Sequence, residues 1–146
     1  ESTSNARMQG YEEGLAEYGI TPIAEQSGNN VSDTAKAAME DLLTRFNNEI
    51  DAVLCHNDDT AIGALSACQD AGVADDITII GFDGNQSAVE LVNSGDLAAT
   101  IAQQPEEMGY TAVMNAYKAI NGEEVEESIP IETVFITQEN AAEYLK

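Results

Sequence analysis

Short apolar runs alternate along the chain with longer segments whose apolar residues recur at helical spacing. The clearest runs are 51–55 (DAVLC), 77–82 (ITIIGF) and 97–102 (LAATIA). The run 77–82 is apolar without polar–apolar alternation, which is typical of a strand covered on both faces. We therefore predict three short buried strands, with further extended segments at 21–24 and at 129–136, where Pro130 interrupts.

The segments between these runs carry helical signals. Predicted helices cover 2–18, 35–46, 58–71, 87–93 and 105–120, with a small helix near Tyr144. Ser32 is placed to cap the second helix, Gly72 to end the third, and Pro105 suits the first turn of the fifth. Strands alternating with helices of this length predict an α/β fold, a three-layer parallel sheet with right-handed crossovers and helices on both faces.

The opening helix has no strand before it, although a parallel sheet normally supplies one. We therefore expect the sheet to be incomplete in this chain. Without the strand expected before the opening helix, backbone donors and acceptors are left unpaired at the sheet edge. The expected partner at that edge is the rest of a larger protein or a second chain.

Composition narrows the choice of partners. The 146 residues are of single-domain size, with 27 Asp and Glu against 5 Lys and Arg and a net charge of −22. Such a chain repels phosphate backbones, and its scattered cations form no basic cluster, so nucleic acid is not an expected partner. No apolar run approaches the ~20 residues that a membrane span requires.

Few residues are suited to catalysis or to metal binding. The chain has two cysteines, Cys55 and Cys68, and one histidine, His56. A lone histidine without a matched nucleophile is more often structural, and both cysteines fit core positions as unreactive, unpaired thiols. The carboxylates of Asp58, Asp59 and Asp83 suit Mg²⁺ and phosphoryl transfer, but no lysine lies at a neighbouring strand end. We therefore expect no enzyme, no metal site and no cofactor.

Polar side chains gather where the predicted strands end, the edge at which α/β sheets bind their ligands. The candidates are Arg7 in the first helix, Asn30 in a loop, Asn57 and Asp83 after two strands, and Gln103 after a third. A carboxylate accepts from neighbouring hydroxyls, arginine donates to oxygens, and an amide does both. The set therefore suits a neutral ligand that is rich in hydroxyls.

Each candidate also has a simpler interpretation. Asp83 before a glycine fits a turn, Asn57 can cap the helix that follows it, and Gln103 can belong to a hinge. Arg7 can offset nearby glutamates on the surface, and Asn30 can be a solvated loop residue.

Three stretches, 52–72, 79–89 and 95–113, carry the motifs HND, GFDG and TIAQQP in this order. They resemble the sugar-binding type I periplasmic solute-binding proteins, the ribose-binding group, and the opening 4–15 resembles the start of that family's second lobe at its ligand edge. The resemblance implies two similar α/β lobes, joined by a hinge, that close on a sugar. It also implies that Arg7, Asn57, Asp83 and Gln103 are the sugar contacts of the second lobe.

By the same resemblance, residues 1–103 are the second lobe without its first helix and strand. Residues 104–132 are expected to pack on a first lobe outside this chain, and 133–146 to return to the second lobe as a strand and terminal helix. One departure bears on the ligand. The loop that carries a stacking aromatic ring in ribose binders reads SGNNVSD here, with Asn29 or Asn30 in its place. This loss favours another pentose, a hexose or a polyol over ribose.

The resemblance thus implies an extracytoplasmic sugar-binding protein, periplasmic or anchored to the membrane as a lipoprotein. It would deliver a monosaccharide or polyol to the permease of an ABC-type importer. The effector-binding domain of a LacI-type transcription repressor shares the fold and stays open as the alternative. The stretch TIAQQPEEMG and the net charge of −22 favour the carrier.

Overall fold

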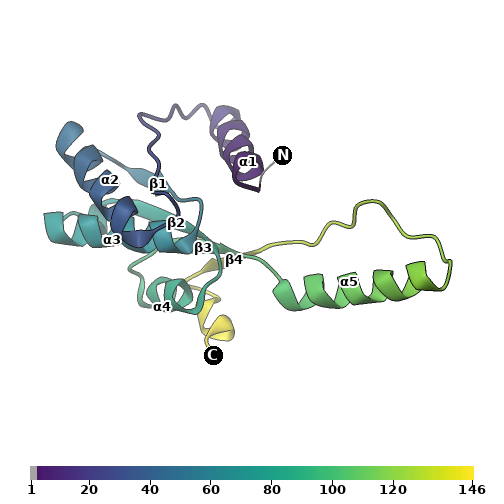
Figure 1. Cartoon of the computed structure of the whole chain (residues 1–146). Helices are drawn as coiled ribbons and strands as arrows, with labels where there is room; N and C mark the ends of the chain where they lie inside the picture. Colours follow the sequence, from purple (N-terminus) through teal and green to yellow (C-terminus); the bar gives the residue numbers. More distant parts are fainter. Residues whose placement is uncertain (1–2) are drawn as a thin grey trace.

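The computed structural model describes residues 3–146, in which four strands form a single sheet. The strands are β1 (Ala52–Leu54), β2 (Thr78–Asp83), β3 (Ala99–Ala102) and β4 (Val134–Thr137), in the order β1-β2-β3-β4 (Figure 1). The first three are parallel, with Leu54 opposite Ile80 and Asp83 opposite Ala102. Their carboxyl ends therefore share one edge, and the predicted α/β class is confirmed.

The strand β4 corrects the expectation of a purely parallel sheet. It pairs antiparallel with β3, so that Thr100 lies opposite Ile136. The chain leaves β3, follows α5 (Pro105–Ile120) away from the sheet and returns through 121–133 (Figure 1). Because this excursion ends at the edge from which it began, the return strand enters in the opposite direction.

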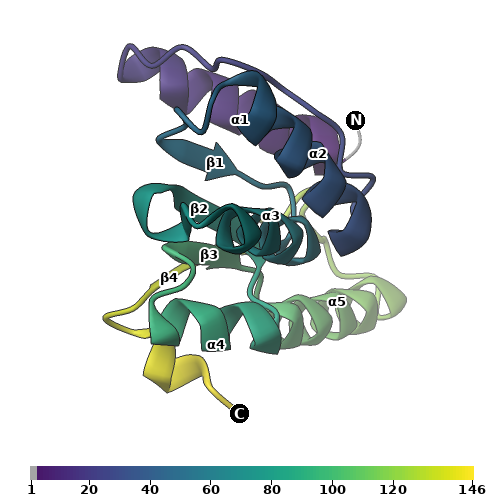
Figure 2. The ribbon, with the colours of Figure 1, turned by 90° about the vertical axis from the view of Figure 1, so that its left-hand side faces the viewer.

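Three helices on one side of the sheet bury most of the core. The helix α3 (Asp58–Ala71) packs on β2, α4 (Gln86–Ser94) packs on β3 and β4, and α2 (Ser32–Arg45) packs on α3 (Figure 2). Ile79 on β2 and Ile136 on β4 are each 1% exposed, and small residues of α3 such as Ala61 are fully buried. Small aliphatic side chains at helical spacing allow the helices to approach the sheet closely.

The helix α3 has clear signals at both ends. The Asn57 side chain accepts from the Thr60 amide in a capping box, and Gly72 ends the helix in the left-handed conformation at φ 70°. Midway along, Gly63 faces the backbone of α2, where a Cβ atom would overlap the Ser32 carbonyl oxygen. A glycine there allows the two helices to cross at close range.

One smaller expectation was wrong. The residue that caps α2 is Val31, and Ser32 is the first helical residue. The small terminal helix is confirmed as a single 3-10 turn, Ala141–Tyr144. The segment 21–24 is not helical, and it has no partner strand within residues 3–146.

Two helices stand apart from the core. Neither α1 (Thr3–Glu17) nor α5 buries any residue. Figure 2 shows α1 behind α2, at the β1 end of the sheet, and Figure 1 shows α5 projecting beyond the carboxyl end of β3. Within the described part of the chain, β1 pairs only with β2, so its outer edge has no strand beside it. No helix among residues 3–146 is both long and apolar enough to cross a membrane.

The two thiols should resist alkylation until the protein unfolds. Cys55 and Cys68 are both buried and free, and burial raises the pKa of Cys55 to about 12 and that of Cys68 above its usual value. The reactive thiolate is therefore scarce at neutral pH. Titration with a thiol reagent at pH 7 should label neither cysteine in buffer and both in denaturant. Rapid labelling of the native protein would contradict the buried placement.

Candidate functional site

Asp83 occupies the carboxyl end of β2 with an unusual backbone. Its φ is 119°, a value that residues other than glycine rarely adopt, and Gly84 follows at φ 76°. A Cβ atom on Gly84 would lie 2.8 Å from the Cα of Ala102, so the turn passes close to β3. Strained backbone of this kind is found more often at functional sites than elsewhere.

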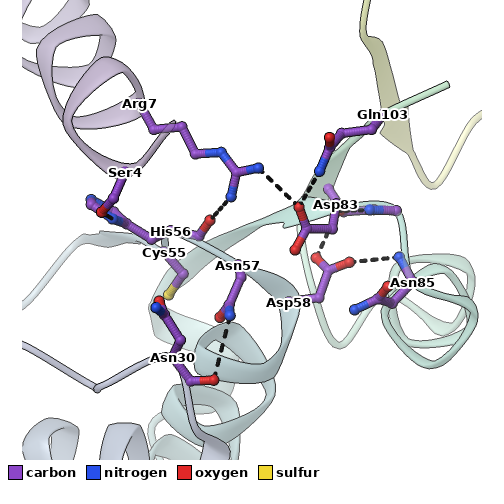
Figure 3. A network of polar contacts seen from close by, with 12 residues as sticks. Ser4, Arg7, Asn30, Cys55, His56, Asn57, Asp58, Asp83, Asn85 and Gln103 are labelled. Atoms are coloured by element: carbon purple, nitrogen blue, oxygen red, sulfur yellow. Dashed lines mark hydrogen bonds and ion pairs between the residues drawn. The ribbon is translucent and has the colours of Figure 1, made fainter. Parts of the chain in front are cut away.

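Arg7 and Gln103 converge on one oxygen of the Asp83 carboxylate. The Arg7 Nη2 donates to Asp83 Oδ1 at 3.0 Å, and the Gln103 Nε2 donates to the same oxygen at 2.6 Å (Figure 3). The ion pair is partly exposed, with side-chain exposures of 16% for Arg7 and 26% for Asp83. Three predicted residues are therefore together, although they come from α1, β2 and the end of β3.

The guanidinium of Arg7 is held on two further sides. Its Nη1 donates to the carbonyl oxygen of His56 at 2.6 Å, and its Cζ lies 3.8 Å from the centroid of the Phe82 ring. Tyr11, one turn further along α1, donates to the Cys55 carbonyl oxygen at 2.9 Å. These contacts attach α1 to the end of β1 and fix the direction in which Arg7 points.

Asn57 and Asn30 form a second polar pair at the same edge. The Asn57 Oδ1 accepts from the Thr60 amide at 2.9 Å, and its Nδ2 donates to the Asn30 carbonyl oxygen at 3.5 Å (Figure 3). Asn30 is exposed and adopts φ 57°, a conformation that asparagine tolerates. The capping role of Asn57 is thus present, and its long amide contact leaves hydrogen-bonding capacity at the edge.

The three carboxylates considered for Mg²⁺ do not form a metal site. Asp58 is fully buried and both of its oxygens already accept hydrogen bonds, from Thr100 Oγ1 and from the Asn85 amide at 2.7 Å each. Asp59 is exposed on the next position of α3. Among residues 3–146, no three His, Cys, Asp or Glu side chains are grouped as a metal ion requires.

Burial of Asp58 should make the stability of the fold depend on pH in a way that the Asp58→Asn variant lacks. Removal from water raises the pKa of Asp58, although hydrogen bonds from Thr100 and Asn85 oppose the shift. The folded state therefore holds this proton more tightly than the unfolded state, which stabilises the fold at low pH and ceases to do so as pH rises through the folded pKa. Relative to Asp58→Asn, the wild-type protein should gain stability as pH falls through that pKa towards 3.8. Urea unfolding at several pH values measures the difference; a difference that stays constant, or moves the other way, would contradict the raised pKa.

A cavity of about 550 Å³ borders the Asp83 cluster. Arg7 and Gln103 reach its wall beside apolar side chains that include Phe82, Ile101 and Met108, whereas Asp83 lies just outside it. Apolar walls with a few convergent polar groups are typical of sites for small neutral ligands. The polar groups of Arg7, Asp83 and Gln103 are hydrogen-bond donors and acceptors, which suit recognition of hydroxyls.

Sequence reasoning missed two residues that shape this site and the role of a third. Phe82 and Thr100 are interpreted from the sequence as ordinary strand residues. Asp58 is placed at the sheet edge by the sequence, but its buried role cannot be distinguished from that of an acidic first helical turn. The only sequence signal is that Asp58 and Thr100 are polar within apolar surroundings. Their pairing depends on the register between strands, which joins residues 42 positions apart.

Comparison with known proteins identifies the family of the chain. Residues 1–124 match the family described as periplasmic binding protein domain. The ribose import binding protein RbsB of Escherichia coli K12 is 33% identical over 138 residues, which cover 94% of this chain and 46% of RbsB. The chain therefore belongs to the periplasmic binding protein family.

Two solved structures are similar over nearly the whole chain. An ABC transporter periplasmic solute-binding protein from Actinobacillus succinogenes with bound D-allose gives a TM-score of 0.89 at 32% identity, covering 94% of this chain and 49% of that one. The Caulobacter myo-inositol binding protein with bound myo-inositol gives 0.84 at 33% identity, covering 94% and 48%. The chain thus spans about half the length of the relatives it matches.

Proposed function

We propose that this chain is the sugar-binding second lobe of a solute-binding protein that delivers a monosaccharide or polyol to an ABC-type importer. The observation that carries the proposal is the Asp83 carboxylate, fixed at the sheet edge by Arg7 and Gln103. A fixed carboxylate beside a guanidinium and an amide presents acceptors and donors to vicinal hydroxyls. Such a protein binds and releases its ligand unchanged, without acting as an enzyme.

The choice among sugars follows from what surrounds the carboxylate. The relatives named above bind or import ribose, D-allose and myo-inositol, all uncharged and rich in hydroxyls. In this chain the loop beside Asn57 presents Asn29 and Asn30 in left-handed conformations and no aromatic ring. Amide contacts in place of stacking favour a polyol, a hexose or a pentose other than ribose.

The exposed face of α5 supports the two-lobe arrangement. Large apolar side chains on this helix are exposed, among them Tyr110, Val113, Tyr117 and Ile120. Contiguous exposed apolar surface is typical of interfaces. We place residues 104–132 against a first lobe, and residues 1–103 and 133–146 in the second. The protein would lie outside the cytoplasm, in the periplasm or attached as a lipoprotein.

Calorimetric titration of the two-lobe protein with pentoses, hexoses and polyols tests the function. At least one neutral member should bind with one-to-one stoichiometry, with affinity unchanged by Mg²⁺. Chain 1–146 alone should bind the same sugar far more weakly, because half of the contacts and the exclusion of water by closure are missing. Binding of phosphate-like anions with Mg²⁺ and of no sugar would overturn the proposal.

A further inference from the structure

We propose that Asp58 is a positioning residue for sugar recognition. Its buried carboxylate ties the start of α3 to β3 and to the turn at residues 83–85, and so holds Asp83 in the backbone conformation that presents its carboxylate to the ligand. The inference takes its ligand, a sugar, from the proposed function. The contact between Asp58 and the turn is part of the structure itself (Figure 3).

The turn at Asp83 requires external support. A non-glycine residue at φ 119° is unfavourable unless its surroundings hold it there. On one side, the Asp83 carbonyl oxygen accepts from the Gln103 amide at 3.2 Å. On the other side, the two amides that follow, of Gly84 and Asn85, have to find acceptors in a partly buried turn.

Asp58 and Thr100 together supply both acceptors. The Asn85 amide donates to Asp58 Oδ2 at 2.7 Å, and the Gly84 amide donates to Thr100 Oγ1 at 3.2 Å. The Thr100 hydroxyl in turn donates to Asp58 Oδ1 at 2.7 Å. The Asp58 carboxylate therefore holds two successive amides of the turn, one directly and one through Thr100.

The surrounding structure is shaped to admit this carboxylate. Asp58 and Thr100 are both fully buried. Gly81 on β2 lies against Asp58, and a Cβ atom at that position would overlap the Asp58 Oδ1. A carboxylate in the first turn of α3 also interacts favourably with the helix N-terminus, but that role needs no contact with Asn85 or Thr100.

The neighbouring Asp59 provides a matched control. It lies in the same first turn of α3 and carries the same charge, yet it is exposed. Asp59→Asn therefore changes the helix-terminal charge without touching the turn. Thr100→Val removes the hydroxyl relay at nearly constant volume, and Thr100→Ser restores the hydroxyl.

Sugar affinity of the folded two-lobe protein is measured by calorimetry for Asp58→Asn, Thr100→Val, Thr100→Ser and Asp59→Asn. Folding is confirmed by circular dichroism. We expect at least tenfold weaker binding for Asp58→Asn and Thr100→Val, and affinity within threefold of wild type for Thr100→Ser and Asp59→Asn. Wild-type affinity in a folded Thr100→Val protein would overturn the proposal.

Proton–nitrogen NMR spectra provide a readout that needs no sugar. In the wild type, the Asn85 amide proton should resonate downfield because it donates to a carboxylate. Asp58→Asn should move this resonance upfield. Thr100→Val should shift the resonance of the Gly84 amide proton and change the amide-proton coupling of Asp83, which reports φ. If these signals do not change in the variants, the positioning role of Asp58 is refuted, whether or not a sugar binds. If the signals change but no sugar binds to the wild type, only the proposed function is refuted.

Discussion

Asp83→Ala should weaken sugar binding by about 100-fold or more. The substitution removes a carboxylate that we expect to accept two hydrogen bonds from ligand hydroxyls, each worth roughly 1.5–3 kcal/mol. A tenfold change in affinity corresponds to about 1.4 kcal/mol. It also leaves Arg7 and Gln103 without their shared partner, so that Gln103 is no longer held towards the ligand and Arg7 keeps only its contacts with His56 and Phe82. Calorimetric titration of the two-lobe protein measures the loss.

Asp75→Ala serves as the control for this experiment. Asp75 is exposed in the turn before β2, at the opposite edge of the sheet. Its replacement by alanine removes one negative charge, as Asp83→Ala does, but far from the site. We expect sugar affinity to stay within about twofold of wild type, because surface charges this far from a neutral ligand contribute little. An equal loss of affinity in both variants would show that net charge, and not the Asp83 contact, governs binding.

Gly63→Ala should destabilise the fold by roughly 3 kcal/mol, the upper end of the range for overpacked cores. The added methyl group would overlap the Ser32 carbonyl oxygen and lie 3.0 Å from both the Ala35 Cβ and the Lys36 backbone nitrogen. Because two of these neighbours are backbone atoms, α2 has to move away from α3. The change in the free energy of unfolding is measured by urea denaturation.

The same substitution elsewhere should have no such effect. Gly14 lies in α1, where an added Cβ meets no atom within 4 Å. Alanine favours helices over glycine by about 1 kcal/mol, so Gly14→Ala should be neutral or slightly stabilising. If Gly63→Ala also left the free energy of unfolding unchanged, the close packing of α2 on α3 at Gly63 would be contradicted.

The sheet edge that carries the site could be predicted from the sequence because parallel strands place their carboxyl ends together. Asp83 and Gln103 follow strands that the apolar runs locate well, and the structure brings both to one point with Arg7. The contact of Asn57 with Asn30 does not follow from this principle, because no strand precedes Asn30 within residues 3–146. That these side chains touch sugar remains a prediction.

The support beneath the edge could not be predicted in the same way. Thr100 occupies a buried position in β3, and only the register between β2 and β3 brings it beside Asp58. Likewise, the stacking of Phe82 on Arg7 depends on how α1 docks, and α1 buries no residue that would mark the contact in the sequence. The extended segment 21–24 joins no sheet within residues 3–146, since an extended segment becomes a strand only beside a partner.

The most direct test of the account is a crystal structure of the two-lobe protein with its bound sugar. We expect sugar hydroxyls within about 3 Å of the Asp83 carboxylate and the Arg7 guanidinium, at ordinary hydrogen-bond distance. A sugar bound elsewhere, with water alone against Asp83 and Arg7, would contradict it.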